Sequence, residues 1–165
     1  MNIRTLKAVA AGSVLALGLV SGAANAATAD GTARATILQQ VTVTNTSDLQ
    51  FGTVAIGTGG GAVTVATGGA RTCATTLVCS GATTAAGFSV SGATGMNVAI
   101  SVPGSVTLTE TGGATMAATL TSSAASLTLA GTAADAFRVG GTLNVGASQA
   151  AGAYAGTFTV TVNYQ

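Results

Sequence analysis

The chain has 165 residues, with five Lys or Arg against four Asp or Glu and no His, which gives a formal net charge of +1. So few charges provide no basic surface to neutralise phosphates, which argues against binding to nucleic acid. Catalysis by acid–base or nucleophilic routes needs a base beside a nucleophile or closely paired carboxylates, so we expect no enzyme and no catalytic residue. We likewise expect no cofactor and no metal site, because metal sites draw on clusters of His, Cys or acidic side chains.

Residues 1–26 have the layout of a signal peptide. Two positive charges near the start precede an apolar stretch at 8–20, and the small residues at 24–26 suit a signal peptidase. The stretch is shorter than the roughly 20 residues of a membrane-spanning helix, so a retained anchor helix is the weaker alternative. We predict a signal-peptide helix, cleavage between Ala26 and Ala27, and no membrane span in the mature chain. The expected location is the periplasm, the medium or the cell surface of a Gram-negative bacterium.

Residues 27–165 have the length of a single domain. Their first part, 27–44, alternates between two faces, with Ala33, Ala35 and Ile37 on one of them. A strand this close to a free terminus could pair with another molecule. It could equally pair within its own chain.

The middle of the chain consists of short runs of Val, Ile, Leu, Phe and Thr separated by small residues. This spacing is typical of an all-β sandwich. An outer-membrane barrel is less favoured, because it needs longer strands of about nine to eleven residues and aromatic girdles. The predicted strands are residues 49–56, 62–65, 87–91, 97–102, 106–108, 116–120, 127–129 and 137–145. The last of them should bend at Gly140-Gly141. Hairpin turns with positive φ are predicted at the Gly-Gly pairs 59–60, 68–69 and 112–113.

Cys73 and Cys79 are the two cysteines of the chain. In an exported protein they predict a disulfide, because the compartment is oxidising. Closing so short a loop contributes about 2 to 3 kcal/mol by the chain-entropy estimate.

The clearest alternation of apolar and polar residues lies at the C-terminus and predicts one long strand at residues 152–165 with an apolar, core-facing side (the dry face). Such a strand at the end of a chain leaves an edge of unpaired backbone groups that invites another strand. The residues of the dry face are Tyr154, Gly156, Phe158, Val160, Val162 and Tyr164.

At its two ends the sequence resembles the pilins of bacterial chaperone-usher systems, especially the spore-coat-protein-like subunits of the archaic branch. Tyr164 is penultimate and Gly152 is fourteenth from the end, as in the C-terminal pattern of such subunits, and residues 48–52 after the N-terminal alternation are also similar. Unlike many archaic pilins, the chain has no cysteine near Val43. Over nearly all of residues 27–165, the chain resembles more closely a secreted proteobacterial family catalogued as a domain of unknown function.

The pilin resemblance implies an incomplete immunoglobulin-like antiparallel β-sandwich that associates with itself. A periplasmic chaperone supplies the missing strand first, and the next subunit supplies it after passage through an outer-membrane usher. The resemblance implies that Ala33, Ala35 and Ile37 belong to a donor strand within residues 27–44. The implied acceptor edge consists of Gly152, Tyr154, Phe158, Val160, Val162 and Tyr164.

The sequence therefore predicts a structural, pilin-like or surface-coat subunit that assembles by β-strand complementation. The alternative is a self-complete, monomeric secreted or surface-binding domain of adhesin-like type with the same sandwich. The placement of residues 33–44 separates the two, because a self-complete domain leaves no groove beside them.

Overall fold

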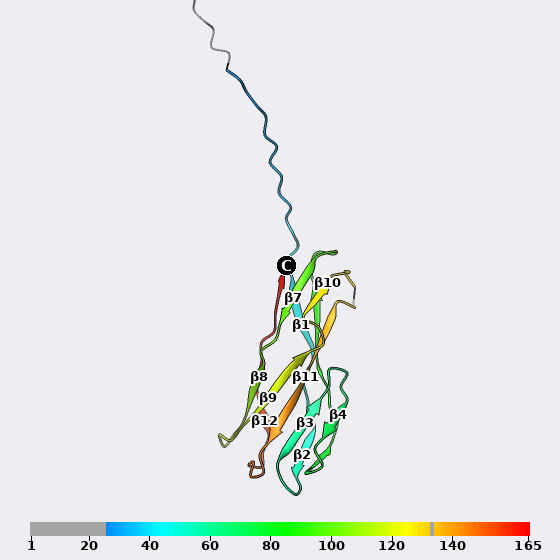
Figure 1. The fold of residues 1–165 in the computed structure, drawn as a ribbon, viewed down its shortest axis with the longest axis vertical. Helices are drawn as coiled ribbons and strands as arrows, with labels where there is room; N and C mark the ends of the chain where they lie inside the picture. The colour runs from blue at the N-terminus through cyan, green and yellow to red at the C-terminus, as the bar shows by residue number, and fades with distance from the viewer. Residues whose placement is uncertain (1–25, 133) are drawn as a thin grey trace, which may run out of the picture. The chain divides into compact units, whose positions relative to one another are not determined.

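A computed structural model describes residues 26–132 and 134–165 (Figure 1). The chain divides into two units, Met1–Ala35 and Thr36–Gln165. Of the first unit, residues 26–35 are exposed and have no regular secondary structure, while the predicted signal-peptide helix lies outside the described residues. The second unit contains the folded domain.

The predicted fold class is confirmed, because the described residues form antiparallel strands and no helix. The strands are β1 (Thr42–Ser47), β2 (Thr53–Ile56), β3 (Gly61–Val65), β4 (Arg71–Cys73), β5 (Leu77–Ser80), β6 (Ala86–Ser91), β7 (Asn97–Ser101), β8 (Ser105–Glu110), β9 (Thr115–Ser122), β10 (Ser126–Thr128), β11 (Ala136–Val145), β12 (Tyr154–Ala155) and β13 (Thr161–Tyr164).

The ten-residue strand β11 organises the largest sheet (Figure 1). Along one edge it pairs with β9, which continues to β8 and β12. Along the other edge its first half pairs with β6 and its second half with β3. β1 extends the sheet beyond β6, and β4 extends it beyond β3. Two smaller sheets, β10–β7–β13 and β2–β5, complete the curled sandwich.

Two core clusters lie between the sheets. The first joins β3, β9 and the end of β11 to β5, and Val63 and Val65 are fully buried in it. The second joins β6 and the start of β11 to β7 and β13, with Phe88 stacked on Phe137 at a centroid distance of 5.2 Å. Each small sheet therefore covers one half of the large sheet.

The prediction of one long C-terminal strand at residues 152–165 is wrong in one respect. The chain forms β12 beside β8, has no strand at 156–160, and then forms β13 beside β7 in a different sheet. A single straight strand cannot pair with both sheets of a sandwich. The expected alternation of burial does hold from Phe158 to Tyr164, because the even-numbered side chains there face the second core cluster.

Other predicted elements differ in detail. Within the predicted donor stretch 27–44, a strand begins only at Thr42. Strands β4 and β5 were not predicted, because their short runs carry little alternation. β11 runs without interruption through Gly140-Gly141. Of the Gly-Gly pairs, Gly69 and Gly113 have positive φ and the pairs at 59–60 and 140–141 do not.

Candidate functional site

The sandwich is open between β2 and β12. A groove of about 940 Å³ lies there, with residues 49–56 as one wall and residues 149–154 as the other. β2 pairs with β5 and β12 pairs with β8, and among the described residues neither strand has a partner on its second edge. Free strand edges offer backbone N–H and C=O groups to another strand.

The floor of the groove belongs to the first core cluster. Its side chains are Leu108, Met116, Leu143 and Val145. No Asp, Glu, Lys or Arg lies among the residues that line the groove. The groove therefore suits an uncharged, extended segment that covers apolar side chains and pairs through its main chain.

Side-chain hydrogen bonds fix the wall at 149–154. Gln149 Nε2 donates to Tyr154 Oη at 2.7 Å and to Thr115 O at 3.2 Å, and Tyr154 Oη donates to Ala150 O at 2.8 Å. A Cβ on Gly152 would meet the side chain of Glu110, with 2.8 Å to its Cδ. Gly152 and Tyr154 thus lie at the groove, as part of an ordered wall.

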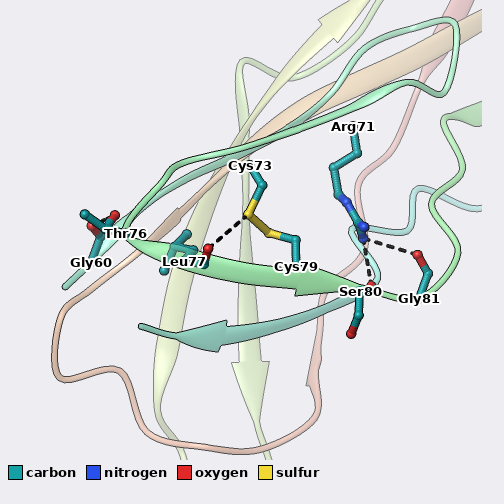
Figure 2. Close-up of a disulfide and its surroundings, with 8 residues drawn as sticks. All are labelled: Gly60, Arg71, Cys73, Thr76, Leu77, Cys79, Ser80 and Gly81. Atoms are coloured by element: carbon teal, nitrogen blue, oxygen red, sulfur yellow. Dashed lines mark hydrogen bonds between the residues drawn. A yellow bond between two sulfur atoms is a disulfide. The ribbon is translucent and has the colours of Figure 1, made fainter. Parts of the chain in front are cut away.

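The opposite side of the β2–β5 sheet is closed. The predicted disulfide is confirmed, and it joins Cys73 on β4 to Cys79 on β5 with a Cα–Cα distance of 6.3 Å (Figure 2). On the same side Arg71 Nη1 donates to Ser80 O at 2.7 Å and to Gly81 O at 3.2 Å. The covalent link therefore holds the β5 side to the large sheet, while the β2 side stays open.

Residues 26–40, called here the N-terminal segment, are exposed and have no strand partner among the described residues. Ala33, Ala35 and Ile37 all lie in it, and the Ile37 side chain is 95% exposed. From Thr42 onward the chain behaves differently, because β1 pairs with β6 of its own chain. The predicted donor stretch 27–44 therefore divides at residue 41.

Tyr164 fixes the root of the N-terminal segment. Its Oη donates to Gln39 O at 2.6 Å and accepts from the backbone N–H of Ala93 at 2.7 Å. This contact places Gln39 beside the C-terminal strand. Within residues 36–165, that strand's end lies at one extreme of the domain, and β2 and β12 lie toward the other (Figure 1).

The structure thus separates the residues of the predicted acceptor edge. Gly152 and Tyr154 line or border the groove. Phe158, Val160, Val162 and Tyr164 instead pack in the second core cluster. Ala26 and Ala27, at the predicted cleavage position, are exposed.

The wall at 49–56 was not predicted as part of the site. A strand was predicted there, but alternation indicates which side chains face the core and carries no information about which strand edge stays unpaired. The floor residues were likewise predicted to lie in strands, but alternation gave no sign that they border an opening. Only the three-dimensional pairing shows that they border an opening.

Asp135 is the one carboxylate buried among the described residues, with an exposure of 3%. It accepts hydrogen bonds from the backbone N–H groups of Ala130, Gly131 and Thr132. The N–H of Ala130 in the first place, with those of Gly131 and Thr132, holds the pKa of Asp135 below its ordinary value against the opposing effect of burial. This carboxylate closes a turn and faces no other titratable group in that turn.

Clusters of metal-ligating side chains and membrane-spanning helices are both absent from the described part of the chain, 26–132 and 134–165. No group of three or more His, Cys, Asp or Glu side chains there could hold a metal ion. No helix in those residues is long and apolar enough to cross a membrane.

A family model described as a domain of unknown function, DUF4402, matches residues 41–164. No curated protein and no solved structure matches the chain.

Proposed function

Because the chain belongs to the DUF4402 family, a domain of unknown function, we propose its role from its geometry: it is a secreted structural subunit that assembles by β-strand complementation at the cell surface. The matched residues 41–164 comprise the strands of the sandwich. The N-terminal segment precedes them. The proposal assigns the groove as acceptor and the N-terminal segment of a second copy as donor.

The open groove is the observation that carries this proposal. Strands β2 and β12 in its walls have free edges, and on its floor the core side chains of Leu108 and Met116 are only half-buried. Covering an apolar floor and satisfying two backbone edges both favour a bound strand.

The N-terminal segment fits the groove in length and charge. After the predicted cleavage, its residues 27–40 extend to about 46 Å at roughly 3.3 Å per residue, and the eight-residue wall at 49–56 needs about 26 Å. Residues 35–40 carry no charge, as the groove lining carries none. Ala35 and Ile37 lie on the same side of an extended strand and can both face the floor.

Position within the domain favours pairing between copies. The root of the segment at Gln39 is bonded to Tyr164, at the end of the domain away from β2 and β12. A donor root and an acceptor at opposite ends make a head-to-tail contact, which repeats as a filament when the rotation between copies does not close a ring. A periplasmic chaperone that covers the groove before assembly, and an outer-membrane usher, are the partners that the pilin resemblance suggests.

An unboiled denaturing gel tests the proposal. Material sheared from cells that express the full chain should give a ladder, which collapses to one band on boiling because strand-exchanged subunits resist detergent. Deletion of residues 28–40 should abolish the ladder. A single monomer band in both lanes for the unaltered chain would refute polymerisation.

The alternative function is a self-complete, monomeric surface-binding domain. The pairing of β1 with β6 favours it, because this part of the predicted donor stretch closes its own sandwich. The same gel decides between the two, since a monomeric domain gives one band with or without boiling.

A further inference from the structure

The wall of the groove formed by β2 depends on a small sheet. β2 and β5 pair only with each other among the described residues, so no ladder of hydrogen bonds joins them to another strand. What holds this sheet in place is the packing of Leu77 in the first core cluster, the packing of Val54 and Cys79 against that cluster, and the links on the β5 side. The wall is therefore less firmly held than one built into the large sheet.

The disulfide lies one strand away from the groove. Cys79 is the cross-strand partner of Val54, which lines the groove, and Cys73 is the cross-strand partner of the buried Val63. The bond therefore connects the wall of the groove, through β5, to the sheet that carries its floor. Figure 2 shows Cys73 and Cys79 bridging these strands with Arg71 beside them.

Arg71 strengthens the same connection. Its Nη1 bonds the carbonyl oxygens of Ser80 and Gly81, and Gly81 itself lines the groove. Ser80 is the cross-strand partner of Thr53, another lining residue. Two tethers, one covalent and one charged, thus hold the β5 side of a sheet whose outer β2 edge has no strand partner among the described residues.

We propose that the Cys73–Cys79 disulfide is the clamp that makes the groove able to accept a strand, and that it leaves the donor function of the N-terminal segment untouched. The inference rests on the proposed function and adds a requirement for its acceptor side. Forming the bond removes two protons and two electrons from the cysteine thiols, which a protein or small-molecule disulfide takes up by exchange and thereby becomes a dithiol. A chain that keeps its thiols reduced therefore donates a strand and accepts none.

This asymmetry gives a specific test. The double variant Cys73→Ser/Cys79→Ser is co-expressed with the unaltered full chain at increasing ratios. Each variant subunit should join a filament through its N-terminal segment and then end it, so the ladder on an unboiled gel shortens as the ratio rises. The variant expressed alone should give no ladder.

Binding of a labelled peptide measures the acceptor side directly. A synthetic peptide of residues 27–40 should bind the monomer fraction of the unaltered chain, and the double serine variant should lose at least tenfold in affinity. Val98→Ala is the matched control, because Val98 is fully buried in the second core cluster, away from the clamp. It should lower the melting temperature and keep the affinity for the peptide.

Arg71→Met keeps the inference testable if the serine variant does not fold. It removes the second tether with the disulfide intact, and the peptide affinity should fall by a smaller factor, about threefold to tenfold. Unchanged affinity in a folded serine variant would overturn the clamp, as would unchanged affinity in Arg71→Met where the serine variant is unfolded. Failure of the unaltered chain both to form a ladder and to bind the peptide would instead overturn the proposed function.

Discussion

Gly140 lies where β11 changes its neighbour from β6 to β3. Its φ is not positive, so conformational freedom is not the reason for a glycine. A Cβ there would contact Val65 O and would lie 2.8 Å from both Ala66 C and Thr67 N. Backbone atoms cannot give way as a flexible side chain does, so the site admits no larger residue.

Gly140→Ala should therefore destabilise the domain by about 2 to 3 kcal/mol, through overpacking against the backbone after β3. Urea unfolding followed by circular dichroism measures the change. Gly59→Ala is the matched control, because a Cβ on Gly59 would meet no atom within 4 Å and its φ is ordinary. The control should change stability by no more than about 0.5 kcal/mol, and equal effects of the two substitutions would contradict the argument.

Asp135 makes stability depend on pH. Its pKa is lowered in the folded domain, chiefly by the backbone N–H of Ala130, so the folded state binds the proton less readily than the unfolded state. The stabilisation is fully present above the unfolded pKa of about 3.9. It is lost as the pH falls through the lower folded value.

The urea midpoint of the unaltered chain should therefore fall on acidification below about pH 4. Asp135→Asn should lower the midpoint at neutral pH and flatten its dependence in this acidic range, because an amide does not titrate there. A parallel acid dependence in both proteins would show that Asp135 is not the responsible group.

At the level of residues, the sequence predicted well where chemistry is local. The disulfide followed from two cysteines and an expected oxidising compartment, and it is present. The role of Gly140 could not be predicted, because the atoms that exclude a side chain come from residues 65–67, far away in the sequence.

At the level of elements, most strands could be predicted from the alternation of apolar and polar residues and from the small residues that separate the strands. The predicted strands at 62–65, 87–91 and 116–120 correspond to β3, β6 and β9 within two residues at each end. The C-terminal stretch was mistaken for one strand, because alternation continues through a crossing between sheets. Gly156 marks that crossing, since a Cβ there would lie 3.1 Å from Thr107 C and would also contact Thr107 O.

The proposed donor element makes a prediction about its two faces. Ile37 lies on the face of Ala33 and Ala35 in an extended segment, and Leu38 lies on the opposite face. Ile37→Asp should abolish the ladder on an unboiled gel, because a carboxylate would be buried on the apolar floor without a partner.

Leu38→Asp is the matched control and should keep the ladder, since its side chain would face away from the floor. Both residues are exposed in the subunit described here, with Ile37 at 95% and Leu38 at 40%, so neither substitution should lower the melting temperature of the monomer. Loss of the ladder in both variants would mean that the register is not the one proposed.

At the level of the whole molecule, the fold class could be predicted and the groove could not. A sandwich follows from many short alternating strands. The groove exists because the two-stranded sheet β2–β5 covers one half of the larger sheet. No local sequence pattern encodes how many strands each sheet of the sandwich contains. Residues 49–56 and 149–154 meet at the opening only because the chain switches sheets before β2 and after β12.

The continuity of β11 has a mechanical consequence. This strand pairs with β6 at one end and β3 at the other, and it takes part in both core clusters. In the proposed head-to-tail filament, a pulling force would enter at the root near Tyr164 and leave at the groove, along the direction in which β11 runs (Figure 1). Its ladder hydrogen bonds then carry the load together in shear instead of opening one at a time, which suits the domain to resist tension along the filament.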